Sequence, residues 1–87
     1  METFIVFFKS TVRTDDFITM PHSAQALYFM LGIHADKNGD CELPKAITKM
    51  IGASEEDLEM LKDLCFIQDV DGKDGAVHVL GALEEER

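Results

Sequence analysis

Apolar positions along the chain follow two different periods, and the change of period marks the predicted elements. Near the N-terminus, Thr3–Phe8 is an uncharged run of aromatic and β-branched residues, which favours a strand. Because both faces of this strand would be apolar, we expect it to be covered on both sides or paired with another chain. Further on the period becomes helical, and Ser23 suits the N-cap of a helix that ends near Ile33.

This helix is apolar on more than one side. One face consists of Ala24, Leu27, Tyr28 and Leu31, and the other apolar positions are Ala26, Phe29, Met30 and Ile33. We therefore expect most of the helix to be buried as core. The residues between the strand and the helix form a polar connector, in which Asp15-Asp16 would cap a short helical turn that reaches Met20.

The segment Asp36–Asp40 predicts a turn with Asn38-Gly39 at its tip. Its oxygen-bearing side chains at alternate positions resemble the start of a calcium loop. A calcium loop needs glycine at its sixth position and glutamate at its twelfth, where this chain has Cys41 and Ile47. We therefore predict no metal site here.

The next segment predicts a strand, a helix, a tight turn and a second helix. Cys41–Leu43 is the short strand, and Pro44 suits the first turn of the first helix. Gly52 ends that helix, Ser54 caps the next one, and Asp57 three residues later completes a near capping box. The positions expected to face the core are Ile47, Met50 and Ile51 in the first helix and Leu58, Leu61 and Cys65 in the second.

Two more predicted strands, Phe66–Asp69 and Ala76–Leu80, flank a glycine-containing turn and form a hairpin. A helix, a short strand, two helices and a hairpin, in this order, are the winged-helix arrangement. We therefore predict an α+β fold of the winged helix-turn-helix type with an extra N-terminal strand. Residues 1–87 form one domain, in which 1–20 are the N-terminal strand and connector, 21–83 the winged-helix core and 84–87 an acidic tail.

Acidic side chains outnumber basic ones by 17 to 8, a formal net charge of −9. The excess lies in residues 54–87, where eleven acids stand against three bases. Such a surface repels nucleic acid and attracts a cationic protein, although acids also keep small domains soluble and suit the first turn of a helix. The carboxylates predicted to bind a partner are Glu55, Glu56, Asp57, Glu59, Asp63, Asp69, Asp71 and Asp74.

Other functional classes find no support in the sequence. No apolar run approaches the length of about 20 residues that a membrane span needs, and no secretory signal is recognisable. The two cysteines are then expected to be reduced thiols in a cytoplasm, with Cys65 as a small core residue. No catalytic motif occurs, and His22, His34 and His78 lack the spacing of metal ligands. We predict a protein that is not an enzyme and needs no cofactor.

Two stretches carry a family resemblance, Ser-Ala-Gln-Ala-Leu-Tyr-Phe at Ser23–Phe29 and Lys-Met-Ile-Gly-Ala-Ser-Glu at Lys49–Glu55. With further matches over residues 8–67, the chain resembles the N-terminal domain of phage replisome-organiser and related phage replication proteins. The resemblance implies a winged helix of phage or prophage origin whose ancestral task is DNA binding at a replication origin. It places Lys45 and Lys49 where they could contact phosphate, and Lys73 is a third candidate. The chain departs from the pattern in the acidic residues around Cys41 and at its C-terminal end.

Three functions are compatible with these features. The first is a phage protein of the anti-CRISPR type, which inhibits a basic host protein or CRISPR effector complex in the bacterial cytoplasm by presenting carboxylates to its DNA- or RNA-binding groove. The second is a DNA-binding replication or regulatory module that uses the lysines. The third is a remnant that only dimerises or joins a larger phage complex. The residues predicted for a homodimer contact are Phe4, Ile5, Val6, Phe7 and Phe8.

Overall fold

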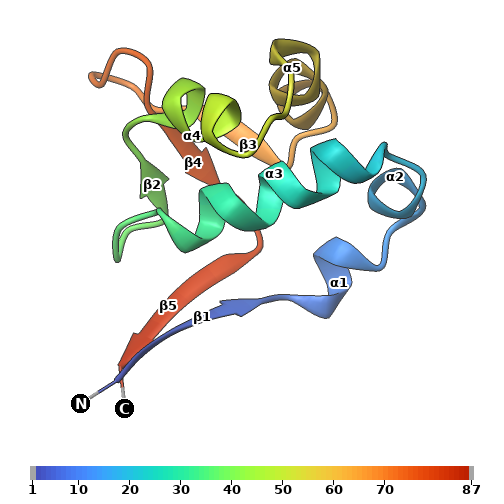
Figure 1. The fold of residues 1–87 in the computed structure, drawn as a ribbon. Helices are drawn as coiled ribbons and strands as arrows, with labels where there is room; N and C mark the ends of the chain where they lie inside the picture. Colours follow the sequence, from blue (N-terminus) through green and yellow to red (C-terminus); the bar gives the residue numbers. More distant parts are fainter. Residues whose placement is uncertain (1, 87) are drawn as a thin grey trace.

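Mostly short helices and strands make up the fold in the computed structural model, which describes residues 2–86 (Figure 1). Within these residues the elements are β1 (Thr3–Phe7), α1 (Lys9–Val12), α2 (Asp15–Ile18), α3 (His22–Ile33), β2 (Asp40–Cys41), α4 (Pro44–Met50), α5 (Glu55–Asp63), β3 (Ile67–Asp69), β4 (Val77–Val79) and β5 (Ala82–Glu86). The strands form two antiparallel sheets, one of order β1-β5 and one of order β2-β4-β3. The predicted α+β class is confirmed.

Helix α3 runs through the centre of the core, and its predicted inward face is confirmed. The fully buried positions on this face are Ala24, Leu27, Tyr28 and Leu31. The predicted cap is wrong, because the helix already begins at His22, Pro21 occupies the N-cap position, and no side chain caps the helix there. The second apolar side is only partly covered, with Phe29 and Met30 half-buried and Ala26 and Ile33 exposed. The expectation that most of α3 is buried is therefore wrong on this side.

Aromatic rings from distant parts of the chain meet around Tyr28. The centroid distances from its ring are 5.7 Å to Phe7, 5.4 Å to Phe17, 5.5 Å to Phe29 and 5.9 Å to Phe66. The Tyr28 hydroxyl donates a hydrogen bond of 2.6 Å to the carbonyl oxygen of Leu80. This bond ties α3 to the connection between β4 and β5, and burial raises the pKa of Tyr28 to about 12.

The three-stranded sheet packs behind α3 and α4 and contains the predicted hairpin of β3 and β4 (Figure 1). Strand β2 begins one residue earlier and ends two residues earlier than predicted, because Leu43 is already the N-cap of α4. The strand pairs Asp40 with His78 and Cys41 with Val77. The turn before it is stabilised by the Asp36 carboxylate, which accepts hydrogen bonds from the backbone N–H groups of Asn38 (2.8 Å) and Asp40 (3.1 Å). Gly39 supplies the left-handed backbone of this turn, with φ +84°.

The N-terminal strand pairs with the C-terminal end of the same chain. In the register of β1 and β5, Phe4 lies opposite Glu85 and Phe7 opposite Ala82. Residues 84–86, predicted as part of an acidic tail, thus belong to the last strand, and Arg87 lies outside the described residues. The Phe7 ring packs against α3, whereas Phe4 is 40% and Phe8 45% exposed. Pairing between chains is not needed to satisfy this strand, although a dimer through residues 4–8 remains a prediction.

Two single-turn helices, α1 and α2, lie in the predicted polar connector; α2 confirms the predicted helical turn, which ends at Ile18 rather than Met20, and α1 was not predicted. The N-cap of α2 is Thr14, whose hydroxyl accepts a hydrogen bond from the N–H of Phe17, so the prediction that Asp15-Asp16 caps this turn is wrong. Asp15 and Asp16 lie in the first turn instead, where the helix dipole favours carboxylates. The amide of Gln25 on α3 donates to the carbonyl oxygens of Phe17 (2.8 Å) and Ile18 (3.2 Å). Buried Phe17 and this amide fasten α2 to the core.

Helices α4 and α5 follow the predicted order, but two positions differ from the prediction. Met50 is exposed, because α4 ends there and turns its buried side, with Ile47 and Thr48, toward the core. Cys65 is exposed and has a left-handed backbone with φ +64°. It occupies the position after the C-cap of α5, where the N–H groups of Cys65 and Phe66 donate to the carbonyls of Lys62 and Leu61 in a Schellman motif. Both Cys65 and the buried Cys41 are free thiols.

The raised pKa of Tyr28 predicts how stability changes with pH. The unfolded chain loses the tyrosine proton near pH 10 and the folded protein only near pH 12, so stability should fall as the pH rises through this interval. Tyr28 is the only tyrosine and the chain has no tryptophan, so tyrosinate absorbance reports this residue alone. A Tyr28→Phe variant, destabilised at all pH values by loss of the hydrogen bond, should lack this part of the decline. Tyrosinate formation near pH 10 with a native circular dichroism spectrum would contradict the prediction.

Candidate protein-binding site

The acidic helix α5 begins with the predicted capping box. The Ser54 hydroxyl accepts a hydrogen bond from the N–H of Asp57 (3.1 Å), and the Asp57 carboxylate accepts one from the N–H of Ser54 (3.0 Å). Gly52, with φ +77°, makes the turn between α4 and α5 without steric strain. Leu58 and Leu61 anchor the inner face of α5 in the core. These contacts fix the direction in which the outer face of the helix points.

Asp57 belongs to the cap rather than to the accessible surface. Only 7% of the residue is exposed, and its carboxylate is engaged with the backbone of Ser54. The sequence pattern marks Asp57 both as a capping residue and as a partner-binding carboxylate. The structure places it in the first role, which leaves it unavailable for the second.

The remaining acids of α5 share one outward face. Glu55, Glu56, Glu59 and Asp63 line a shallow groove together with the half-buried side chain of Met60. All four carboxylate residues are exposed. We call these four residues and Met60 the acidic face of α5. An apolar side chain among carboxylates allows contact with a guanidinium or ammonium group and with the methylene stem that carries it.

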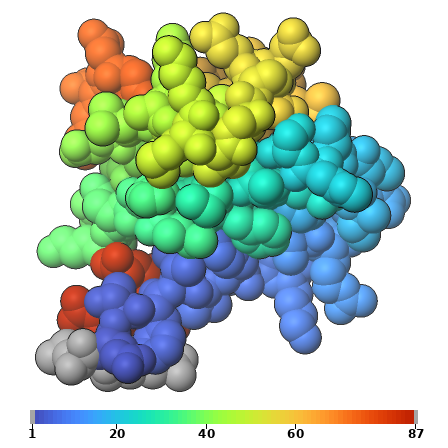
Figure 2. Space-filling model, viewed as in Figure 1, coloured from blue at the N-terminus to red at the C-terminus, as the bar shows by residue number. Residues whose placement is uncertain are grey.

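Lys62 joins the acidic face of α5 to the base of the hairpin. Its ammonium nitrogen lies 3.2 Å from the Asp69 carboxylate and 3.9 Å from that of Glu59. Two of the predicted acids are thus partly neutralised, although an exposed ion pair of this kind contributes little stability. Asp71 and Asp74 lie in the exposed turn between β3 and β4. In the space-filling view the hairpin turn (orange) and α5 (yellow) project along the same edge of the molecule (Figure 2).

The three lysines predicted to contact phosphate occupy different surroundings. Lys45 and Lys49 are exposed on α4, one helical turn apart, and line a small pocket that also includes Glu55. Lys73 lies in the hairpin turn, where its ammonium nitrogen is 3.7 Å from the Asp40 carboxylate. The structure therefore brings two of the three together and holds the third beside an acid.

A polar cluster at the edge of the three-stranded sheet has no counterpart in the sequence predictions. The Nδ1 atom of His78 lies 2.8 Å from the Asp40 carboxylate, whose other oxygen faces Lys73. Asp40 and His78 are partners in the register of β2 and β4. The pair could have been found only from the strand register, because 38 residues separate the two side chains along the chain.

Two further features complete the chemical description of residues 2–86. No group of three or more His, Cys, Asp or Glu side chains in this part of the chain is placed to hold a metal ion. Within the same residues, no helix is both long and apolar enough to cross a bilayer.

Comparison of the chain with protein-family models, with curated proteins and with solved structures finds no match. The resemblance to replisome organisers therefore stays a prediction.

The capping box predicts the effect of changing Ser54. A Ser54→Ala variant should lose about 1 kcal/mol of unfolding free energy, because the N–H of Asp57 loses its acceptor. Ser23→Ala is the matched control, since Ser23 is exposed near the start of α3 and caps nothing. Urea unfolding followed by circular dichroism measures both. Equal effects of the two substitutions would show that the box does not hold the start of α5.

Proposed function

We propose that this chain is a small acidic protein, of phage or prophage origin, that binds and inhibits a nucleic-acid-binding machine of the bacterial host. The acidic face of α5 would occupy the basic groove that otherwise holds DNA or RNA, as in inhibitors of the anti-CRISPR type. The partner is then a basic host protein or CRISPR effector complex in the host cytoplasm, and the chain acts by binding rather than as an enzyme. The observation that carries this proposal is the exposed row of carboxylates on α5.

The geometry of α5 favours contact with cations. Glu55, Glu59 and Asp63 recur at intervals of four residues, so their carboxylates follow one another along the helix. A basic groove that binds nucleic acid meets a similar succession of negative charges. Charge-assisted hydrogen bonds from arginine or lysine to such carboxylates are stronger than neutral ones, and the net charge of −9 steers the protein toward a cationic surface.

The order of the elements supports a winged-helix ancestry for this surface. Helix α3, strand β2, helices α4 and α5 and the hairpin of β3 and β4 follow one another as in that fold, and β2 pairs with β4 at the sheet edge. In a helix-turn-helix protein the second helix of the motif enters the major groove, and that helix corresponds to α5. We propose that α5 derives from a DNA-recognition helix and has become an acidic helix that binds protein.

A second candidate function rests on the two lysines of α4. Lys45 and Lys49 are exposed side by side, and in this interpretation the chain is the DNA-binding module of a phage replication initiator or a transcriptional regulator. The adjacent Glu55 opposes such contact, because its carboxylate would approach the same phosphates. This arrangement makes DNA binding the weaker of the two proposals.

Charge reversal on α5 tests the inhibitor function. A Glu55→Lys/Glu56→Lys/Glu59→Lys variant should lose about a hundredfold or more in its affinity for a target effector, because three attractive contacts become repulsive. The measurement is inhibition of DNA cleavage by a panel of CRISPR effector complexes, with circular dichroism to show that the fold persists.

The matched control for this reversal is Glu2→Lys/Asp15→Lys/Asp16→Lys. It changes the net charge equally and also places lysines in the first turn of a helix, but none of its three positions belongs to the groove that the acidic face of α5 lines. This control should inhibit nearly as well as the unmodified protein. If the two triple variants inhibit equally, net charge alone matters and the acidic face of α5 is not the site.

A salt titration of duplex DNA binding separates the two candidate functions. The inhibitor proposal predicts no measurable affinity for duplex at about 0.15 M salt, because the acids exclude phosphate. Fluorescence anisotropy of a labelled duplex measures this. Affinity that falls steeply with salt, and that a Lys45→Glu/Lys49→Glu variant abolishes, would instead support the replication-initiator function.

A further inference from the structure

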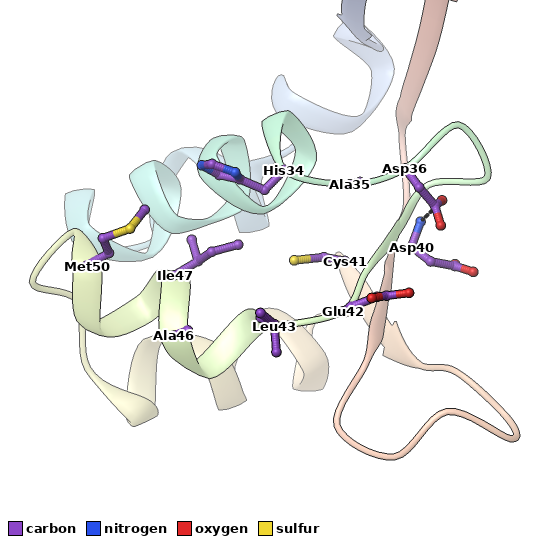
Figure 3. Close-up of a pocket in the computed structure, with 10 residues that line it drawn as sticks. All are labelled: His34, Ala35, Asp36, Asp40, Cys41, Glu42, Leu43, Ala46, Ile47 and Met50. Atoms are coloured by element: carbon purple, nitrogen blue, oxygen red, sulfur yellow. Dashed lines mark hydrogen bonds between the residues drawn. The ribbon is translucent and has the colours of Figure 1, made fainter.

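A groove separate from the acidic face of α5 runs between the C-terminal end of α3, strand β2 and helix α4. Its apolar lining consists of Ala35, Cys41, Leu43, Ala46, Ile47 and Met50. In the close-up, the Cys41 sulfur and the Ile47 side chain point into the space between α3 and α4 (Figure 3). Met50 lies at one end of the groove, and Asp36, Asp40 and Glu42 lie at the other (Figure 3).

Two large apolar side chains flank this groove without being covered. Leu43 is 68% exposed and Met50 is 66% exposed, whereas Cys41 and Ile47 beneath them are buried. Exposed apolar residues around a concave apolar surface are typical of sites that bind other proteins. Methionine suits such a site, because its flexible thioether adapts to different partner side chains.

The acidic end of the groove determines which partner fits. Glu42 is exposed and has no ion pair within the described residues. The Asp36 carboxylate is held by the backbone N–H groups of Asp40 and Asn38, which lower its pKa and keep it charged. Asp40 is engaged by His78 and Lys73. No lysine or arginine lines the groove.

We propose that this groove docks a segment of a partner protein in which two apolar side chains are followed by a lysine or arginine. The apolar pair would rest between Leu43 and Met50, above Cys41 and Ile47. The cation would then reach Glu42 and Asp36 at the acidic end. An amphipathic helix or an extended strand could supply this sequence of side chains, because in both forms neighbouring residues of one face lie close together.

Charge disfavours the other occupants of the groove. A second copy of this chain would bring its own net charge of −9 against an acidic rim. Nucleic acid and anionic lipid would meet Asp36 and Glu42, and the lining offers His34 but no lysine or arginine to offset them. A basic, apolar protein segment has neither disadvantage.

This site is independent of the proposed function, because its residues lie in the segment after α3, on β2, in the connection to α4 and on α4, and none belongs to the acidic face of α5. The full chain is therefore used in a selection with a phage-displayed library of random short peptides. We expect the enriched peptides to carry paired apolar residues followed by lysine or arginine. The resonances that shift on titration with an enriched peptide should be those of Leu43, Ala46 and Met50.

Three variants locate the binding. Leu43→Ser/Met50→Ser should weaken the binding of the enriched peptides by about tenfold or more, and Glu42→Lys should weaken peptides with a cation more than versions with that cation changed to alanine. Ile18→Ser is the matched control, because Ile18 is a 60% exposed apolar residue on α2, and it should change nothing. All three changes are at exposed positions, so the fold should persist.

Several outcomes would overturn the inference. These are a selection that enriches nothing, enriched peptides without basic residues, and peptides that bind the Leu43→Ser/Met50→Ser variant as tightly as the unmodified protein. If the resonances of the groove residues shift when the protein is concentrated without peptide, the occupant is instead a second copy of the chain. Because the Glu55→Lys/Glu56→Lys/Glu59→Lys variant should bind the peptides normally, failure here is distinguishable from failure of the proposed function.

Discussion

The packing of aromatic rings around the buried side chain of Tyr28 is the contact on which the rest of the structure depends. Phe7 brings the N-terminal strand to α3, Phe17 brings α2, and Phe66 brings the segment between α5 and β3. In a chain of this size a single core supplies little stability beyond the conformational entropy lost on folding, so one cluster that joins four segments matters greatly. The Tyr28 hydroxyl helps to position α3 relative to the strands, because it donates a hydrogen bond to the carbonyl oxygen of Leu80. The surfaces of α4 and α5 are positioned only because this core holds α3.

Much of this arrangement could be predicted from local signals. The helical period predicted α3, the capping residues predicted the start of α5, and the glycine-containing turn predicted the hairpin, because each depends on neighbours in sequence. The pairing of β1 with β5 could not be predicted, since it joins opposite ends of the chain and places glutamates opposite apolar residues. Cys65 was expected in the core from its apolar surroundings. A C-terminal motif that requires a left-handed residue turns it outward instead.

The candidate sites likewise combine features that follow from neighbouring residues in the sequence with features that depend on contacts between distant segments. The outward position of Glu55, Glu56 and Glu59 on α5 follows from the period of Leu58 and Leu61, so the sequence predicted most of the acidic face. The bridge from Lys62 to Asp69 depends on how the hairpin lies against α5, which no local pattern specifies. The groove beside α4 could not be predicted either. Its lining joins segments on both sides of the turn at Asp36–Asp40, and one of its exposed side chains, Met50, is a residue that the helical period had assigned to the core.

On α5, the residues that pack in the core are different from the residues that carry the negative charge. This explains how so small a protein can keep an acidic surface. Carboxylates destabilise a fold most when they occupy positions that packing needs, because burial of an unpaired charge adds to their mutual repulsion. On α5 the core positions are leucines, Asp57 is taken up by the cap, and Glu55 and Glu56 lie in the first turn, where the helix dipole offsets part of their repulsion. The outer face can therefore carry negative charge at little cost to folding. Because Leu58 and Leu61 hold α5 in the core, the charge of the outer face can be reversed while the core contacts are kept, although lysines in the first turn lose the favourable interaction with the helix dipole.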